Sequence, residues 1–440
     1  MAFTRTNRWL RLGPCAISLL VLTSAVCADP NELPAPTPRQ SLPILKLEDA
    51  IYYALENNPG IVALRQQHNI AAAKIVIADT YPFNPVVENR IQGANGPASA
   101  AVDNHLPFEQ VMIWEVELRR QSRYRRQGAA ATLSRTDWEI AYQEQLLAVQ
   151  VVRAYSGQLY RQEKLRLLEE TLKLNQRQVE DTHRLVDKLG KLKVADRIAA
   201  EAEVSLTLIA IGEARKSLAE ARQELFRALG IVDAAIDIEG ALESPPLKWD
   251  AAMLSDLAVS RRADLQARQA ALNEAYAAYR LAKANRFGNP SIGTAYTYDP
   301  TRISMIGAQI NVPLAVFNTR RGEVYQSEEE YTQASLLARQ TEINVRQDVA
   351  LALARLEAAE RQVAQFKTKV LPDLQRAVED MEKLFQNGEI DAIKIIDVRR
   401  NLLKARDGYI DALWGVRQAR ADLLAATGEP ILGLVVPSPK

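Results

Sequence analysis

Residues that could bind a metal ion or act as nucleophiles are few. Three histidines, His68, His105 and His183, lie far apart in the sequence, and both cysteines, Cys15 and Cys27, precede residue 28. No phosphate-binding glycine loop, His-Glu-x-x-His motif or nucleophile elbow occurs. We therefore expect a protein that is not an enzyme, has no cofactor and has no dedicated metal site.

The first 28 residues have the features of a secretory signal peptide. Arginines precede an apolar run, and a small-residue cleavage site ends the segment at Val26-Cys27-Ala28. A proline-rich linker, residues 29–44, is expected to follow. A lipid anchor at Cys27 stays open, although Ser24 and Val26 depart from the usual lipoprotein pattern.

Removal of that signal leaves a mature chain with balanced charge. The segment contains three arginines and no acidic residue, so 52 basic side chains remain against 54 acidic ones. This balance argues against a nucleic-acid partner. No later stretch reaches the roughly 18 apolar residues of a membrane-spanning helix.

An internal repeat of about 200 residues organises the rest of the chain. Three pairs of motifs recur in the same order: Asn84-Pro85 as Asn289-Pro290, Arg119-Arg120 as Arg320-Arg321, and Gly190 with Gly230 as Gly388 with Gly428. Duplication of a domain-sized unit explains them. We assign residues 45–240 to the first repeat, 241–430 to the second and 431–440 to a tail.

Each repeat is expected to contain a leading helix, two strands and a long helical hairpin. The leading helices are predicted over about 47–80 and 250–284. Alternation of apolar and small or polar residues predicts strands near 85–93, 108–118, 290–299 and 303–312. At about ten residues each, they match the length of a membrane-crossing strand.

The hairpins are longer than those of globular domains. Residues 121–189 contain no proline, and about 1.5 Å per residue gives a rod of roughly 100 Å. Residues 323–387 have apolar side chains in steps of three, four and seven, which is typical of a coiled coil. Pro372 predicts a kink or short break that the first hairpin lacks around Leu174.

Four strands cannot close a membrane barrel alone, because unpaired edges would be left in lipid. The barrel must be shared between chains, and three copies would give twelve strands around an open lumen. Trp114 and Tyr298 are expected near the membrane interfaces. From periodicity alone, a compact helical bundle stays open.

In the order of these motifs the chain resembles the TolC-like outer membrane factors. The opening stretch 45–59, the Arg119-Arg120 joint and the stretch from Gly388 through Asp397-Val398-Arg399 to Gly428 carry the resemblance. The simple joints and short loops look most like the cobalt-zinc-cadmium resistance branch.

The resemblance implies a homotrimer in the bacterial outer membrane, with most of its mass in the periplasm. A periplasmic α-helical barrel would continue a twelve-stranded β-barrel in outer-membrane lipid. Its partners would be a periplasmic adaptor (membrane fusion) protein and an inner-membrane transporter of the resistance-nodulation-division class. Heavy-metal cations are the candidate substrates; channels for drug efflux or type I secretion, and a periplasmic coiled-coil adaptor, remain alternatives.

The resemblance also indicates where the channel narrows. Family members carry acidic rings about six and nine residues after the second tip glycine, positions that Lys394 and Asp397 occupy here. Asp397 matches and Lys394 departs, so a mixed ring of Asp196, Lys394 and Asp397 is one interpretation. Ordinary solvated tip charges are the other. We expect Lys394 to neutralise Asp397 in a closed tip.

Two further surfaces are predicted. Gly190, Leu192, Gly388 and Ile390 would dock the adaptor at the hairpin tips, or pack within the tips themselves. Arg119, Arg120, Arg320 and Arg321 would lie at the inner rim of the barrel, contacting lipid headgroups or capping strand ends. A solvated helix start is the alternative reading of the arginines.

Overall fold

A computed structural model describes residues 45–93, 106–188, 193–232, 236–245, 250–299, 301, 303–387 and 389–428, with side chains at 187, 188 and 392 left out. All of these residues belong to one compact unit, residues 42–440. The predicted signal peptide, linker, tail and tip glycines Gly190 and Gly388 lie outside the described residues.

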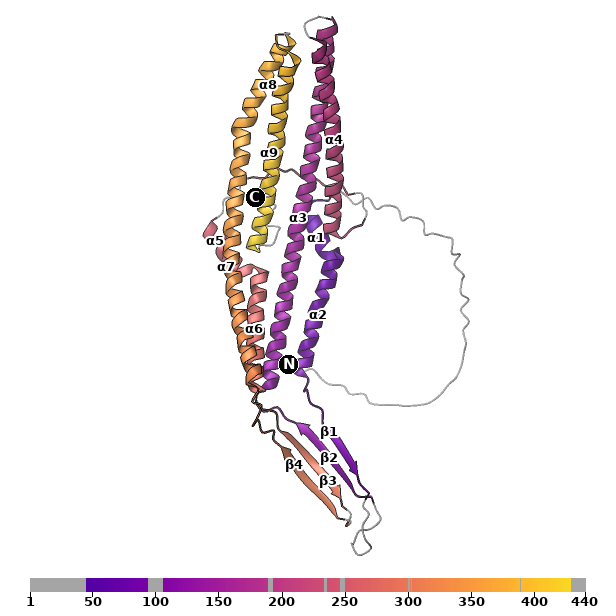
Figure 1. The fold of residues 1–440 in the computed structure, drawn as a ribbon, viewed down its shortest axis with the longest axis vertical. Coiled ribbons are helices and arrows are strands. Elements are labelled where there is room, and N and C mark those ends of the chain that lie inside the picture. Colours follow the sequence, from indigo (N-terminus) through magenta and orange to yellow (C-terminus); the bar gives the residue numbers. More distant parts are fainter. Residues whose placement is uncertain are drawn as a thin grey trace, which may run out of the picture. The chain divides into compact units, whose positions relative to one another are not determined.

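Helices account for most of the unit, and the same element order occurs twice (Figure 1). The first half contains α1 (Leu47–Asn57), α2 (Pro59–Asp79), β1 (Val86–Ile91), β2 (Phe108–Glu115), α3 (Gln121–His183) and α4 (Val194–Leu229). The second half contains α5 (Ala251–Arg261), α6 (Ala263–Ala284), β3 (Ser291–Tyr298), β4 (Ser304–Asn311), α7 (Arg321–Gln365), α8 (Leu371–Gln386) and α9 (Ala392–Thr427). The expected class, mainly helical with long hairpins and four strands, is confirmed.

The four strands form one antiparallel sheet in the order β1-β2-β3-β4. Figure 1 shows the sheet at one end of the helices, beyond the starts of α3 and α7. All four predicted strands are present, and each is two or three residues shorter than expected. None of the helices in the described ranges combines the length and apolar composition needed to cross a membrane.

Both leading helices are broken, which the sequence prediction missed. Pro59 has no amide hydrogen and disfavours helical geometry at Asn58, so α1 ends there. The Asn58 side chain then accepts a hydrogen bond from the Gly60 amide at 2.9 Å and caps α2. In the second half the break falls at Arg262, where no proline is present.

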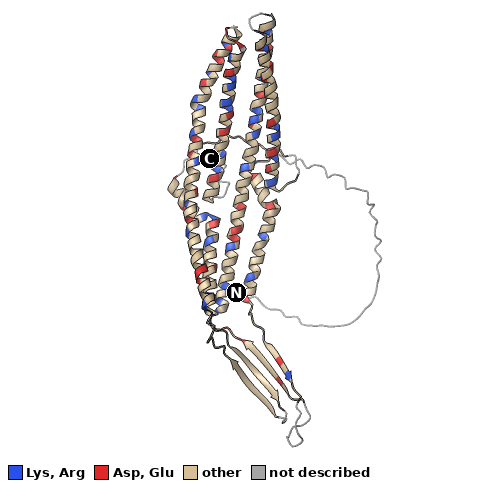
Figure 2. Ribbon diagram, viewed as in Figure 1, with Lys and Arg blue, Asp and Glu red and all other residues tan. Residues whose placement is uncertain are grey.

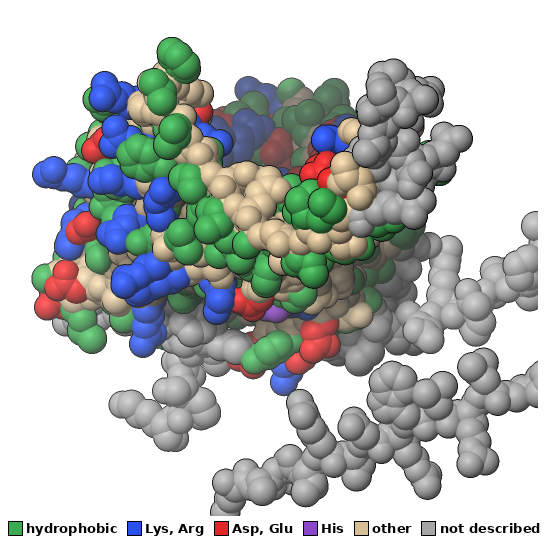
Figure 3. Space-filling view, turned by 90° about the horizontal axis from the view of Figure 1, so that it is seen from below, with side chains coloured by type: hydrophobic (Ala, Val, Ile, Leu, Met, Phe, Trp, Pro, Cys, Tyr) green, Lys and Arg blue, Asp and Glu red, His purple; other side chains and the backbone are tan. Residues whose placement is uncertain are grey.

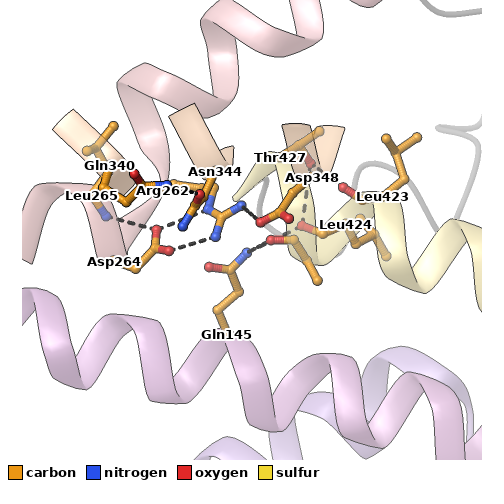
Figure 4. Close-up of polar contacts among 11 residues, drawn as sticks. Gln145, Arg262, Asp264, Leu265, Gln340, Asn344, Asp348, Leu423, Leu424 and Thr427 are labelled. Atoms are coloured by element: carbon orange, nitrogen blue, oxygen red, sulfur yellow. Dashed lines mark hydrogen bonds and ion pairs between the residues drawn. The ribbon is translucent and has the colours of Figure 1, made fainter. Parts of the chain in front are cut away.

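Arg262 is held at its break by two carboxylates (Figure 4). Its guanidinium donates to Asp264 at 2.6 and 3.0 Å and to Asp348 of α7 at 2.8 Å. Burial alone would lower the pKa of Arg262, but these hydrogen bonds outweigh burial and the pKa is raised. The charged pair therefore joins α6 to α7 beside the end of α9.

A left-handed glycine packs against each break. Gly230 ends α4 at φ +76°, and a Cβ there would lie 2.9 Å from Pro59 Cδ. Gly428 ends α9 at φ +69°, and a Cβ there would lie 3.0 Å from Arg262 Cα. Both the backbone conformation and the close approach require glycine at these positions.

The predicted break at Pro372 is confirmed as a π-helical segment, Phe366–Val370, between α7 and α8. The amide of Leu371 donates to Phe366 O, five residues back, so the helix accommodates a proline that has no amide hydrogen. Around Leu174, α3 continues without interruption; its own π-helical segment, Arg184–Lys188, comes later.

The apolar core lies along the helices, about midway between the sheet and the hairpin tips. One cluster joins α1, α3 and α4 with α9 and includes Val151, Leu225 and Leu229; a second joins α5, α7 and α9 and includes Val345, Leu356 and Leu423. Tyr155 of α3 donates to the carbonyl oxygens of Leu45 and Glu239. Its hydroxyl therefore ties Leu45, just before α1, to Glu239, which follows α4.

Candidate channel surfaces

The sheet has one face with charged side chains and one face without. Neighbouring residues on a strand point to opposite faces, and paired residues share a face. The strand pairing places Glu88, Arg90, Glu109 and Glu115 together. This charged face therefore carries every charge found in β1 to β4.

The opposite, uncharged face is mostly apolar or aromatic. Trp114 pairs with Ile292, and Ile292 pairs with Ile310; Phe108 pairs with Tyr298. The remaining side chains on this face are Val87, Asn89, Ile91, Gln110, Met112, Thr294, Tyr296, Ser304, Ile306 and Ala308. Figure 2 shows how few charges the sheet carries compared with the helices.

Aromatic side chains mark both ends of the uncharged face. At the helical end, Trp114 meets Tyr81 edge to face, with ring centroids 5.7 Å apart. At the far end, Phe108 contacts Tyr296 and Tyr298 at 5.5 and 6.1 Å. Six residues of β2 separate the two groups, which corresponds to about 20 Å.

Both edge strands, β1 and β4, have one side unpaired in the single chain. Every side chain of β1 is exposed, as are all but one of β4. Each strand thus offers a free row of backbone donors and acceptors to another chain.

The predicted rim arginines occupy matching positions where a strand leads into a long helix. Arg120 and Arg320 precede α3 and α7 with φ of 61° and 48°, and in the described part of the chain no other non-glycine residue has positive φ. Arg119 donates to the carbonyl oxygens of Phe287 and Gly288, and Arg320 donates to Asn285 O at 3.1 Å. Arg321 is the first residue of α7.

A buried polar chain at the same joint was not predicted. Gln121 accepts from the Arg119 amide at 2.8 Å and donates to Asn289, which in turn donates to Glu115 at 3.0 Å. Next to it, Arg125 forms an ion pair with the nearly buried Glu117. The repeated Asn-Pro motif pointed to this position, but the pairing with Gln121 crosses 168 residues of sequence.

The three predicted constriction residues have different environments. Asp196 is 4% exposed, and its carboxylate accepts from the Lys193 amide at 3.0 Å, so it caps α4. Lys394 and Asp397 are exposed in the first turns of α9. Asp397 does not have the partner that we expected. Its carboxylate lies 3.7 Å from the guanidinium of Arg400, and within the described residues it makes no ion pair with Lys394.

Arg400 and its neighbour Arg399 connect the two hairpins near their tips, a feature that sequence reasoning missed. Arg400 also pairs with Glu203 of α4 at 2.6 Å. Arg399 pairs with Glu382 of α8 at 2.6 Å and donates to Gln178 of α3. The contacts with Glu203 and Gln178 cross from one hairpin to the other and therefore restrain the separation of the hairpins.

Of the predicted docking residues, only Ile390 is described. It is half-buried against a small apolar cluster of Leu185, Phe385 and Ile395. Gly190, Leu192 and Gly388 lie outside the described residues. Across the described ranges, no three His, Cys, Asp or Glu side chains come together as a metal-binding group.

Known proteins share this arrangement. The profile of a family described as Outer membrane efflux protein matches residues 254–429. The cobalt-zinc-cadmium resistance protein CzcC of Cupriavidus metallidurans is 23% identical over 407 residues, covering 90% of this chain and 92% of CzcC. The region 254–429 therefore belongs to the outer membrane efflux protein family.

Solved structures with the same fold cover most of this chain. CusC has a TM-score of 0.74 at 18% identity, over 92% of this chain and all of the CusC chain. The outer-membrane channel OprN has a TM-score of 0.71 at 16% identity, over 87% and 89%. The Campylobacter jejuni channel CmeC has a TM-score of 0.70 at 14% identity, over 87% and 85%.

The matched family is one of outer-membrane efflux proteins, and the solved structures that share the fold include membrane channels. The predicted family and its location are thereby confirmed.

Proposed function

We propose that three copies of this chain form a passive conduit in a tripartite efflux system. Their twelve strands would close a β-barrel, and their hairpins would continue it as a periplasmic tunnel. An inner-membrane transporter of the resistance-nodulation-division class supplies the energy, and a periplasmic adaptor joins it to the channel.

The sorting of charge between the faces of the sheet carries this proposal. An arginine or lysine facing lipid at the bilayer centre costs about 2 to 4 kcal/mol, and a glutamate costs less but is still unfavourable. Glu88, Arg90 and Glu109 avoid this cost only if the charged face is turned to water. The aromatic groups about 20 Å apart then fall near the two interfaces of an outer-membrane barrel.

Pairing of β4 with β1 of the next chain explains why both edges are free. Unpaired backbone groups in lipid cost several kcal/mol each, so neither edge can remain open. Two chains would give eight strands and an interior filled by side chains. Three chains give twelve strands and leave a lumen.

The proposed substrate class is heavy-metal cations. CzcC, which aligns with 90% of this chain, is a cobalt-zinc-cadmium resistance protein. The charged face has three glutamates and one arginine per chain, and Arg90 lies 3.2 Å from Glu109. A lumen with surplus carboxylates favours cations over anions.

The hairpin tips are the proposed docking site for the adaptor. We propose that Gly190, Leu192, Gly388 and Ile390 take part in it. We propose Asp397 and Lys394 as residues near the constriction. Asp196 is proposed there only as a support, since its carboxylate caps α4.

Two adjacent residues of β4 provide a matched test of the membrane-facing surface. Ala308 lies on the uncharged face and Gln309 on the charged face. Ala308→Lys should sharply reduce the amount of trimer in the sarkosyl-insoluble outer membrane, whereas Gln309→Lys should leave it near the wild-type level. Equal insertion of both variants, or recovery of the wild type with soluble proteins as for an adaptor, would contradict the proposal.

Substrate class is tested separately in cells. A strain lacking the channel should become more sensitive to Co²⁺, Zn²⁺ and Cd²⁺, and the wild-type chain should restore resistance. Sensitivity to dyes or detergents without any change for the metals would indicate a drug-efflux channel instead.

A further inference from the structure

Three arginines converge on the short turn between α6 and β3. Arg119 donates to the carbonyl oxygens of Phe287 and Gly288, and Arg320 donates to Asn285 O at 3.1 Å. The third, Arg286, belongs to the turn itself. Arg119 and Arg320 lie some 170 and 35 residues away from this turn in sequence. Together they bring positive charge to the four residues 285–288.

Two of these guanidinium groups share one aromatic ring. The Cζ atoms of Arg119 and Arg286 lie 5.2 and 5.4 Å from the centroid of Phe287. Nε of Arg286 is buried and has no hydrogen-bond partner in the described structure. Cation–π contact orients the two guanidiniums but neutralises neither.

No carboxylate of the described residues balances this cluster. None lies within the 4.0 Å ion-pairing distance of Arg119, Arg286 or Arg320. Glu115 is close in the hydrogen-bonded chain, but its Oε1 accepts from Asn289. Glu117 is paired with Arg125. Positive charges held together without counter-charge repel one another and favour an external anion.

An exposed apolar segment lies beside the same turn. Gly288 approaches Pro313 so closely that a Cβ on Gly288 would lie 2.7 Å from Pro313 Cγ. Pro313 begins the connection from β4 to α7, where Leu314, Val316 and Phe317 are 80%, 70% and 102% exposed. Figure 3, seen from the strand end, shows hydrophobic and basic side chains next to one another on this face.

Apolar side chains that enter the acyl region beside arginines that reach phosphates are typical of a membrane interface. The cluster lies where the uncharged face of the sheet ends and the helices begin, which is the periplasmic boundary of the bilayer if the proposed function holds. Phosphodiester groups match the planar guanidinium, which can donate two parallel hydrogen bonds.

We propose that Arg119, Arg286 and Arg320, together with the apolar segment 313–317, form a binding site for the headgroup of an acidic phospholipid. The inference rests on the proposed outer-membrane location and goes beyond it, because general insertion into a bilayer needs no preferred lipid. Basic pockets at membrane boundaries bind such headgroups through the same chemistry.

Native mass spectrometry of the full-length, detergent-purified protein tests this site. Phosphatidylglycerol and phosphatidylcholine with the same acyl chains are added in equal amounts, and the bound adducts are compared. The wild type should retain phosphatidylglycerol preferentially. In the variant Arg119→Gln/Arg286→Gln/Arg320→Gln the preference should fall roughly a hundredfold, since each arginine near an anionic headgroup contributes about a fivefold gain.

A matched control removes the same charge elsewhere. Arg166→Gln/Arg361→Gln/Arg376→Gln alters three exposed helical arginines that form short-range pairs within their own helices. This control should keep the wild-type preference. An equal loss in both triple variants would reduce the effect to net charge and overturn the proposal, as would an unchanged preference in the first.

Single substitutions guard against a folding defect, because Arg286 makes no side-chain hydrogen bond in the described structure. Arg286→Gln should lower the preference about fivefold, and Arg286→Lys should restore part of it. If Arg286→Gln instead splits the oligomer while lipid preference persists, the cluster is a contact between chains and the proposal fails. Sarkosyl fractionation of the same variants reports separately on outer-membrane insertion.

Discussion

At the scale of single residues, the two halves of the chain stabilise the break in their leading helix with different side chains. A break in the leading helix receives the end of a return helix, and a left-handed glycine allows the close approach in both halves. The first half satisfies its break with the Asn58 amide, which also donates to Ala228 O at 3.1 Å. The second half uses the guanidinium of Arg262. Duplication has thus conserved the geometry while the side chains diverged.

Loss of the Arg262 guanidinium should destabilise the protein. Arg262→Met leaves Asp264, itself mostly buried, without its cation, which typically costs about 3 kcal/mol when the pair is buried. We expect a clear drop in the thermal midpoint of the detergent-solubilised protein, followed by circular dichroism at constant pH. The control Arg346→Met removes an exposed ion pair with Asp256 and should have little effect. Equal shifts for both variants would contradict a special role for the break.

A second prediction at this scale concerns Gly230 at the end of α4. Gly230→Ala places a Cβ at positive φ and 2.9 Å from Pro59 Cδ, which should cost at least about 1 kcal/mol. Gly157→Ala is the matched control, because a Cβ there meets nothing within 4 Å inside helix α3. That variant should be neutral or gain up to about 1 kcal/mol. Chemical denaturation of both variants gives the comparison.

At the scale of elements, two sequence signals predicted the structure well: the alternation of side chains along strands and the position of proline in a helix. In β3 and β4 large apolar residues alternate with small ones, and the predicted strands came within one residue of those observed at all four ends. Pro372 predicted the helix interruption because proline lacks an amide hydrogen. Arg262 gave no such signal, since its break depends on Asp348, 86 residues away.

In the candidate site, too, contacts between residues far apart in sequence could not be predicted. Arg119 and Arg320 could be selected from their repetition, but their acceptors on residues 285–288 could not. Ion pairs between the hairpins, such as Arg400 with Glu203, join residues 197 positions apart. Ion pairs between residues so far apart produce no periodic pattern in a single sequence, so they could not be predicted from it. The charge sorting of the sheet required the register of β1 against β2, which alternation within one strand does not define.

The π-helical segment before Pro372 belongs to this scale. Pro372→Ala supplies the missing amide, so a hydrogen bond to Thr368 O can form and the segment should become more regular. We expect slower amide hydrogen exchange for residues 366–373 in the variant than in the wild type. Exchange in the corresponding part of α3, around Leu174, should not change. Unchanged or faster exchange at 366–373 would show that packing against α9, not the proline, maintains the π-helical segment.

At the scale of the whole molecule, the proposed conduit would open only if the hairpins can separate at their tips. Each chain holds its two hairpins together through Arg400, which bonds Glu203 of α4 at 2.6 Å and lies 3.7 Å from Asp397. The pKa of Arg400 is raised chiefly by its hydrogen bond with Glu203, so the guanidinium stays charged throughout the physiological range. The link is therefore electrostatic, partly exposed and sensitive to screening.

The last prediction concerns this link and the charge beside it. Arg400→Ala should loosen the tips and raise single-channel conductance in planar bilayers, because it removes the bond to Glu203 and frees Asp397 at once. Glu203→Gln removes the same bond but leaves Asp397 paired with Arg400, so conductance should rise without a change in cation selectivity. Asp397→Ala should lower cation selectivity at low salt, where like charges from three chains attract cations most strongly. Arg376→Ala is the control: it removes an exposed arginine that pairs with Asp373 of its own helix, and we expect conductance to stay near the wild-type value. If Arg400→Ala and Glu203→Gln both conduct like the wild type, the bond between the hairpins does not restrain the tips, and the constriction must be maintained by contacts between chains.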